Sequence, residues 1–67
     1  MIHLPELTKP ELLDIFELAN FTEREAELFW LRSSGKTHDE CVEIMNLSES
    51  TEKRTNKKMI AKIMMVI

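Results

Sequence analysis

Repeated signals for helix N-termini constrain the fold of this chain more than any other feature of its sequence. Four residues that favour the N-cap position are spaced along it, namely Thr8, Thr22, Thr37 and Ser48. Glu25 and Glu40 each stand three residues after one of them, which is the spacing of a capping box. Hairpin dipeptides and alternating strand-like runs are missing, and glycine occurs once, at Gly35. The pattern therefore predicts an all-α fold with four helices.

We expect one small domain over residues 1–67, with short turns between the helices. The predicted helices run from about Lys9 to Ala19, from Thr22 to Gly35, from Thr37 to Met45, and from Ser48 onward. Left-handed residues at Gly35 and Asn46 would end the second and third helices. Apolar positions at helical spacing predict the core: Leu12, Leu13 and Phe16 with Ala19 or Ile15; Ala26, Phe29 and Trp30 with Leu28 or Leu31; Cys41, Val42 and Met45 with Ile44; and Met59, Ile60, Ile63, Val66 and Ile67.

Composition excludes several classes of protein. An apolar fraction of 43% and a charged fraction of 31% are typical of a soluble folded domain. The first residues lack the basic and apolar regions of a signal peptide, and no run approaches the roughly 20 apolar residues that span a bilayer. We therefore expect a cytoplasmic protein. A single cysteine, Cys41, excludes an internal disulfide.

Candidate metal or catalytic residues are few. His38 and Cys41 have a helical i, i+3 spacing that could hold a metal, but only His3 could supply a third nitrogen or sulfur ligand. Cys41 is more simply a small buried apolar residue. No set of nucleophile and base is present, and one glycine cannot build a phosphate loop. We expect no metal, no cofactor and no enzymatic activity.

Charge is sorted along the chain, although its net value is only -3. Residues 1–31 contain two basic and seven acidic side chains, whereas residues 32–67 contain seven basic and five acidic ones. From Lys53 onward there are five basic side chains and no acid. Such a run usually only keeps a helix solvated, but it can also form a face that attracts a polyanion.

The segments around the basic run predict a helix-turn-helix over residues 37 to about 58. A short capped helix is followed by the turn Asn46-Leu47-Ser48 and then by a helix that opens with small polar residues. Leu47 would be the apolar plug between the two helices. Short side chains at Ser50 and Thr51 would let the second helix approach base edges in a major groove about 12 Å wide.

The segment FTEREAELFWLRSSGKTHDECVEIMNLSEST-KR resembles the DNA-binding domain of LuxR/FixJ-type response regulators, and less closely region 4 of bacterial sigma factors. The matching positions are Thr22, Arg24, Glu25, Glu27, Leu31, Gly35, Lys36, Thr37, Glu40, Leu47, Ser48, Thr51 and Lys53. The resemblance covers about half of the chain without insertions, and it implies DNA binding by a recognition helix over about residues 49–62. The residues that it places on DNA are Lys36, Thr37, Ser50, Thr51, Lys53, Arg54 and Lys57, to which we add Lys58.

One departure from the family pattern lies inside the predicted recognition helix. Glu52 stands where the family has a valine that faces the core, and a helical wheel also turns Glu52, Thr55 and Asn56 inward. Glu52 is therefore either a surface residue after a slight helix rotation, or an inward acid paired with Arg24 or Arg32. The same wheel places Lys62 on the outer side with the other bases.

The C-terminal segment predicts a second kind of surface. Its apolar residues surround the helix almost completely, so they form either core alone or an interface with a homodimer or protein partner. The residues concerned are Met59, Ile63, Met64, Met65, Val66 and Ile67. We expect a small transcriptional regulator that binds double-stranded DNA. The alternative is an interaction module that binds RNA polymerase, a sigma factor or another regulator without binding DNA.

Overall fold

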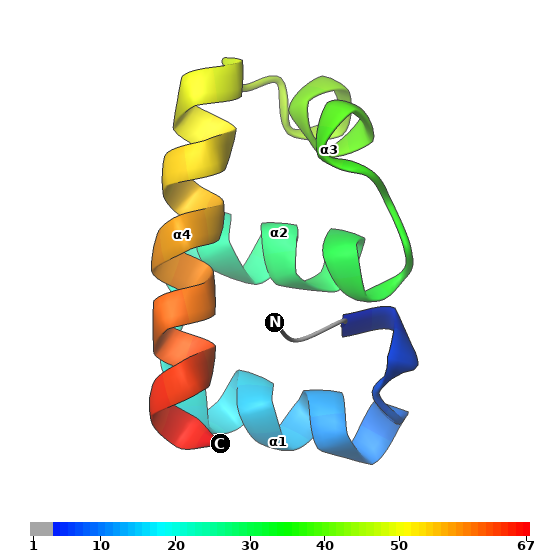
Figure 1. The fold of residues 1–67 in the computed structure, drawn as a ribbon, viewed down its shortest axis with the longest axis vertical. Coiled ribbons are helices and arrows are strands. Elements are labelled where there is room, and N and C mark those ends of the chain that lie inside the picture. The colour runs from blue at the N-terminus through cyan, green and yellow to red at the C-terminus, as the bar shows by residue number, and fades with distance from the viewer. Residues whose placement is uncertain (1–3) are drawn as a thin grey trace.

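The computed structural model describes residues 4–67, and every regular element in this range is helical. A short 3-10 helix, η1 (Leu4–Glu6), precedes α1 (Lys9–Ala19), α2 (Glu23–Ser33), α3 (His38–Met45) and α4 (Glu49–Val66). The predicted all-α fold with four helices is confirmed. In Figure 1 α4 runs along the molecule, α1 and α2 cross it one below the other, and α3 lies beside its N-terminal end.

Side-chain caps fix the start of each α-helix. Thr22 and Thr37 form the predicted capping boxes, and Thr8 forms a third, in which its side chain accepts from the backbone N–H of Glu11. Ser48 caps α4 with a hydroxyl that lies 3.2 Å from the backbone nitrogen of Thr51. Each cap satisfies N–H groups that have no partner within the helix, which explains why the four helices begin close to the residues predicted from sequence.

Left-handed residues end α1 and α3, and another lies in the turn after α2. The φ angles are 55° at Asn20 and 53° at Asn46, while Gly35, after α2, has a φ of 89°. Asparagine tolerates this conformation better than most side chains, and glycine adopts it without strain. The stops predicted at Gly35 and Asn46 are therefore confirmed, and the chain reverses sharply enough to bring each helix against its neighbours.

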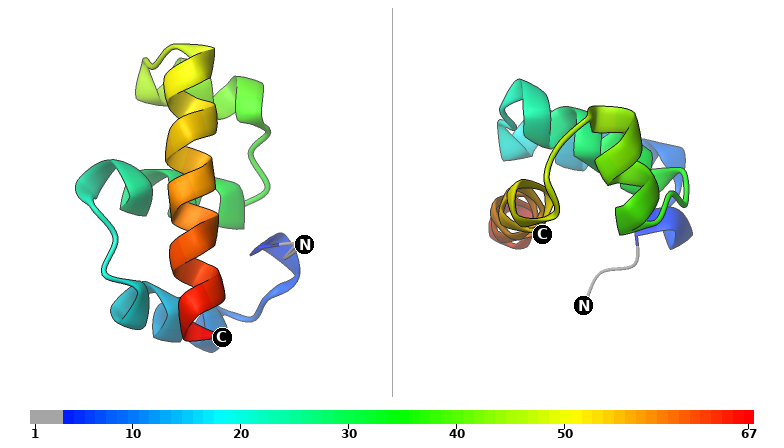
Figure 2. Two further views of the ribbon diagram at one scale, coloured as in Figure 1. Left: turned by 60° about the vertical axis from the view of Figure 1, so that its left-hand side comes forward. Right: turned by 90° about the horizontal axis from the view of Figure 1, so that it is seen from above.

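The buried core is drawn from η1 and all four α-helices. Phe16, Phe21, Phe29 and Trp30 stack in a cluster with neighbouring ring centroids 5.0 to 6.2 Å apart. The fully or nearly buried apolar residues are Leu4, Leu12, Ile15, Ala19, Leu28, Phe29, Cys41, Met59 and Ile63. The views in Figure 2 show that α4 packs with one side only, so the opposite side of this helix stays open to solvent.

Three residues predicted for the core are exposed instead. The α1 stripe passes through Leu12, Ile15 and Ala19, which leaves Leu13 44% exposed. Ile44 lies on the outer side of α3 and is 52% exposed, because Cys41 makes the buried contact of that helix. Ile67 follows the last helical residue and is 66% exposed.

The predicted plug, Leu47, is only half-buried. It lines a surface hollow with Glu23, Arg24, Glu27 and Met45 and does not join the buried core. Its backbone N–H donates to the carbonyl of Val42, which fixes the turn before α4. The close packing of α3 against its neighbours therefore depends on Cys41, which is fully buried.

Candidate nucleic-acid interface

The N-terminal half of α4 presents a basic surface to solvent. Its exposed cations, which we call the basic stripe, are Lys53, Arg54, Lys57 and Lys58. Successive helical residues turn by about 100°, so these four side chains spread over the side of α4 opposite to the buried Met59 and Ile63. In the left view of Figure 2 this helix stands in front of the rest of the molecule along its whole length.

The basic stripe has no acidic partner among the described residues. Two ion pairs occur within residues 4–67: His38 with Glu52, and Lys62 with Glu25. The positive charges of the stripe are therefore not neutralised within the described part of the chain, and they are accessible to a polyanion.

The first turn of α4 places two small hydroxyl residues beside this stripe. Ser50 is exposed, whereas Thr51 is half-buried and takes part in the cap. The hydroxyl of Ser48 donates to the hydroxyl oxygen of Thr51 at 2.8 Å. The Thr51 hydroxyl can still donate its own hydrogen, so its role in base contact stays a prediction. Glu49 is exposed in the same turn and adds a negative charge at this end of the helix.

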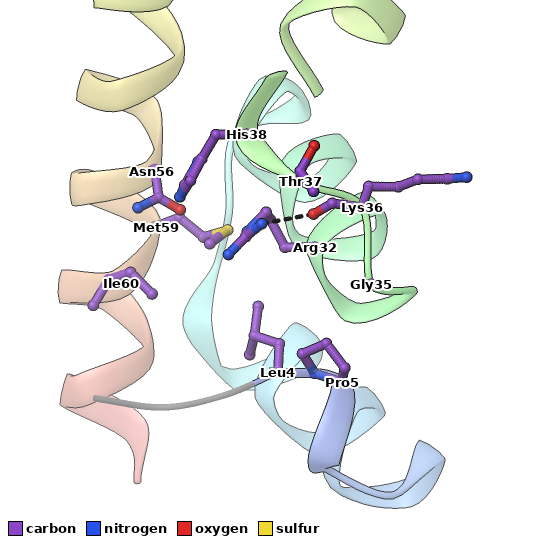
Figure 3. Close-up of a pocket in the computed structure, with 10 residues that line it drawn as sticks. All are labelled: Leu4, Pro5, Arg32, Gly35, Lys36, Thr37, His38, Asn56, Met59 and Ile60. Atoms are coloured by element: carbon purple, nitrogen blue, oxygen red, sulfur yellow. Dashed lines mark hydrogen bonds between the residues drawn. The ribbon is translucent and has the colours of Figure 1, made fainter. Parts of the chain in front are cut away.

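Lys36 and Thr37 lie at the start of α3. The Thr37 hydroxyl accepts from the backbone N–H of Glu40. Hydrogen bonds from the Thr37 N–H and hydroxyl hold the pKa of the Glu40 carboxyl below its usual value. The Lys36 carbonyl accepts from Nη1 of Arg32 at 2.6 Å. Figure 3 shows both residues at one wall of a groove whose opposite wall includes Asn56 of α4. Lys36 and Thr37 therefore line this groove, whereas the residues of α4 that line it, Asn56, Met59 and Ile60, are not among the predicted DNA-binding residues.

Glu52 points inward and is 1% exposed. Its two carboxylate oxygens lie 2.7 and 2.9 Å from Nδ1 of His38, the first residue of α3. Of the two alternatives that the sequence left open, the inward acid is the one observed, but its partner is His38 rather than Arg24 or Arg32. The pair joins α3 to α4 across the turn and supplies the polar partner that a buried carboxylate needs.

The helical wheel predicted Lys62 on the outer side with the basic stripe, and this prediction is wrong. Its ammonium donates to Oε1 of Glu25 at 2.6 Å and to the carbonyl of Asn20 at 3.2 Å. The long lysine stem reaches back over the apolar surface, which a wheel based on Cα positions cannot represent. Burial raises the pKa of Glu25, but hydrogen bonds from Lys62 and from the Thr22 N–H outweigh it, so the pKa lies below its ordinary value.

The predicted C-terminal partner surface is smaller than expected. Met59 and Ile63 are fully buried in the core, so they cannot contact a partner. Met64, Met65 and Ile67 remain 59%, 86% and 66% exposed. Val66, the sixth residue of the predicted surface, is half-buried and packs against the core.

The structure offers little for metal or thiol chemistry. Within residues 4–67 no group of three or more His, Cys, Asp or Glu side chains could hold a metal ion, and His3 lies outside the described residues. Burial raises the pKa of the Cys41 thiol, which disfavours the reactive thiolate. No helix in the described range combines the length and the apolar character that crossing a bilayer requires.

Sequence reasoning did not identify His38 as the partner of Glu52, and it did not bring Arg32 and Asn56 into one groove. The residues of each pair are 14 or more positions apart in the chain, which is beyond the reach of a capping or helical-wheel pattern. Comparison of the whole chain with protein-family models, curated proteins and solved structures finds no match.

Proposed function

We propose that this chain is a small DNA-binding transcriptional regulator, in which α3, the turn 46–48 and α4 act as a helix-turn-helix. The observation that carries this proposal is the basic stripe on the outer side of α4, which follows a capped turn and has no acidic partner among the described residues. The stripe would neutralise phosphates, while the first turn of α4 enters the major groove.

The size and exposure of α4 fit this role. Its 18 residues form a rod roughly 27 Å long that is packed on one side and open on the other. Ser50, at the exposed N-terminal end, is short enough to let the helix backbone approach base edges. Arg54 lies one turn later and can form a bidentate contact with guanine, which contributes on the order of 1–3 kcal/mol of discrimination.

The inward position of Glu52 supports the proposal. Its carboxylate is buried against His38 and is directed away from the side that would face DNA. The negative charge that directly precedes the basic run in the sequence is therefore not part of the basic surface. Glu49 is the acid that remains exposed in the first turn of α4, and we expect it to weaken DNA binding.

Fluorescence anisotropy with a labelled duplex of about 30 bp tests the proposal at roughly 50 and 200 mM salt. Five phosphate contacts, four from the basic stripe and one from Lys36, would weaken binding by roughly 500-fold over this range. Removing two charges with Lys53→Gln/Arg54→Gln should lower the slope of log affinity against log salt by about 1.8. Lys9→Gln is the matched control, because this exposed lysine lies at the start of α1, in another part of the molecule.

Two outcomes would contradict the proposal. One is the absence of salt-dependent binding at tens of micromolar protein, the range in which non-specific DNA binding is normally measured. The other is an equal loss of affinity in the Lys9 variant and in the double variant, because the basic stripe would then have no special role.

The second candidate function is a protein-interaction module. Met64, Met65 and Ile67 are exposed, and Ile67 lines a groove between α1 and the end of α4 together with Leu18, which is 65% exposed. Exposed apolar surface of this kind is typical of an interface. Sedimentation at several protein concentrations separates the two candidates: self-association that is lost in Met65→Ser, together with no DNA binding, would favour the interaction module.

A further inference from the structure

A groove of about 440 Å³ lies between η1, the end of α2, the start of α3 and the middle of α4. Its size falls within the range of pockets that hold small molecules. The residues that line it are Leu4, Pro5, Arg32, Gly35, Lys36, Thr37, His38, Asn56, Met59 and Ile60. This described lining contains cationic and apolar residues and no acidic one.

Three polar side chains from three helices converge on this groove. Figure 3 shows Arg32 of α2, His38 of α3 and Asn56 of α4 directed into the same space. The Lys36 side chain extends away from it in the same view, so Arg32 is the cation that faces the interior. Convergent polar groups from separate elements are typical of a ligand site, because the fold itself holds them in position.

Arg32 carries a positive charge that the described residues do not neutralise. It is half-buried, and its side-chain hydrogen bond within the described residues runs from Nη1 to the neutral carbonyl of Lys36. That bond, which Gly35 permits through its positive φ, anchors the guanidinium at the groove wall. An arginine has five N–H donors in a planar fork, so most of them remain available to a carboxylate or phosphate.

The surroundings of Arg32 define what would fit. Glu52 does not line the groove, and both of its carboxylate oxygens are engaged by Nδ1 of His38. Leu4 and Met59, which are almost fully buried, supply an apolar floor. A bare anion would leave this floor uncovered, whereas an anion attached to a compact apolar group would satisfy both halves of the groove.

We infer that this groove binds a small organic anion, a phosphate or carboxylate joined to a compact apolar body, with Arg32 as the main contact for the charge. Asn56 donates its amide N–H groups to the same ligand, and the apolar body packs against Leu4 and Met59. The site is separate from the basic stripe and does not depend on DNA binding, so it goes beyond the function proposed above.

Phenyl phosphate serves as the probe, with inorganic phosphate and phenol as probes for its two halves. In a titration of ¹⁵N-labelled protein, phenyl phosphate should shift the backbone amides of Gly35, Lys36 and His38 and should bind at about millimolar concentration or better. Inorganic phosphate and phenol should each bind at least about fivefold more weakly than phenyl phosphate, because each contacts either Arg32 or the apolar floor but not both.

Arg32→Met should weaken phenyl phosphate binding by about tenfold or more, since it removes a charge-assisted contact. Arg32→Lys keeps the charge and the stem but loses the fork, so it should give a smaller loss and serves as a second variant if Arg32→Met folds poorly. Lys9→Met is the matched control outside both the groove and the basic stripe, and it should leave binding unchanged.

Three results would overturn the inference. They are equal losses in Arg32→Met and Lys9→Met, shifts confined to the basic stripe, and equal affinities for phenyl phosphate and inorganic phosphate. A duplex DNA titration separates the two sources of phosphate. If DNA shifts the same groove amides and displaces phenyl phosphate, the groove holds a backbone phosphate and the assignment to a small ligand is wrong.

Discussion

Removing the imidazole of His38 should destabilise the protein more than any other substitution of a half-exposed residue in α3. The carboxylate of Glu52 is 1% exposed and has both oxygens within 2.9 Å of Nδ1 of His38. In a His38→Ala variant the Glu52 carboxylate would stay buried without this partner. Removing one member of a buried pair is strongly destabilising, because the other member is left buried and uncompensated.

The loss of stability expected for His38→Ala lies between two limits. Breaking a fully buried ion pair costs about 3–5 kcal/mol, and breaking a surface pair costs about 0–1 kcal/mol. The His38 side chain is 48% exposed, so solvent screens its half of the interaction, and we expect a loss of about 2 kcal/mol. A chain of 67 residues has a total stability of about 3–10 kcal/mol, so the melting temperature should fall by about 8–16 °C.

A double-mutant cycle measured by circular dichroism in thermal and urea melts checks this reasoning. Glu52→Met replaces the buried carboxylate by an apolar side chain of similar length, and we expect it to be close to neutral. In that background His38→Ala should cost less than about 0.5 kcal/mol, because no buried charge is left without a partner. Equal costs of His38→Ala in both backgrounds would refute the account, as would a His38→Ala variant that melts within about 2 °C of the wild type.

Further predictions concern an ion pair, a thiol and an exposed acid. Because the pKa of Glu25 is lowered, its contribution to stability is fully present above the ordinary value of 4.5 and is lost as the pH falls toward the lowered value. Lys62→Met should lower stability at neutral pH and flatten its dependence on pH below 4.5 in acid melts; an unchanged slope would count against the pair. Cys41 should react with a thiol reagent at least about tenfold more slowly in the folded protein than in urea, and fast native labelling would contradict its burial. Glu49→Gln should strengthen DNA binding by a few fold in the anisotropy assay, and weaker binding would show that Glu49 does not face the phosphates.

Local sequence signals predicted the helices of this chain well because its helix starts are encoded within four residues. Thr22 with Glu25 and Thr37 with Glu40 each form a closed pair of hydrogen bonds that requires no other part of the fold. The same holds for the stop at Asn46, which needs only a residue that tolerates a left-handed conformation. These features could be read from the sequence because they involve no packing against a distant segment.

The sides of the helices were predicted less well, and the polar pairs were missed. Leu13 and Ile15 are both apolar, and only the packing of α1 against α4 decides that Ile15 is the buried one. The helical wheel turned Glu52 inward but left a surface position open, and its partner depends on how α3 lies against α4. Lys62 meets Glu25 over a separation of 37 residues, a contact that no periodicity can indicate.

The link made by Lys62 also has a consequence for how the chain folds. The capping pairs span three residues and can form as soon as each helix nucleates, whereas Lys62 joins Asn20 and Glu25 across 42 and 37 residues. Closing such long loops costs chain entropy, so this contact belongs late on the folding pathway. Loss of the Lys62 ammonium should therefore speed unfolding and leave the folding rate nearly unchanged. In that case Lys62 determines how long the molecule stays folded, rather than how quickly the chain folds.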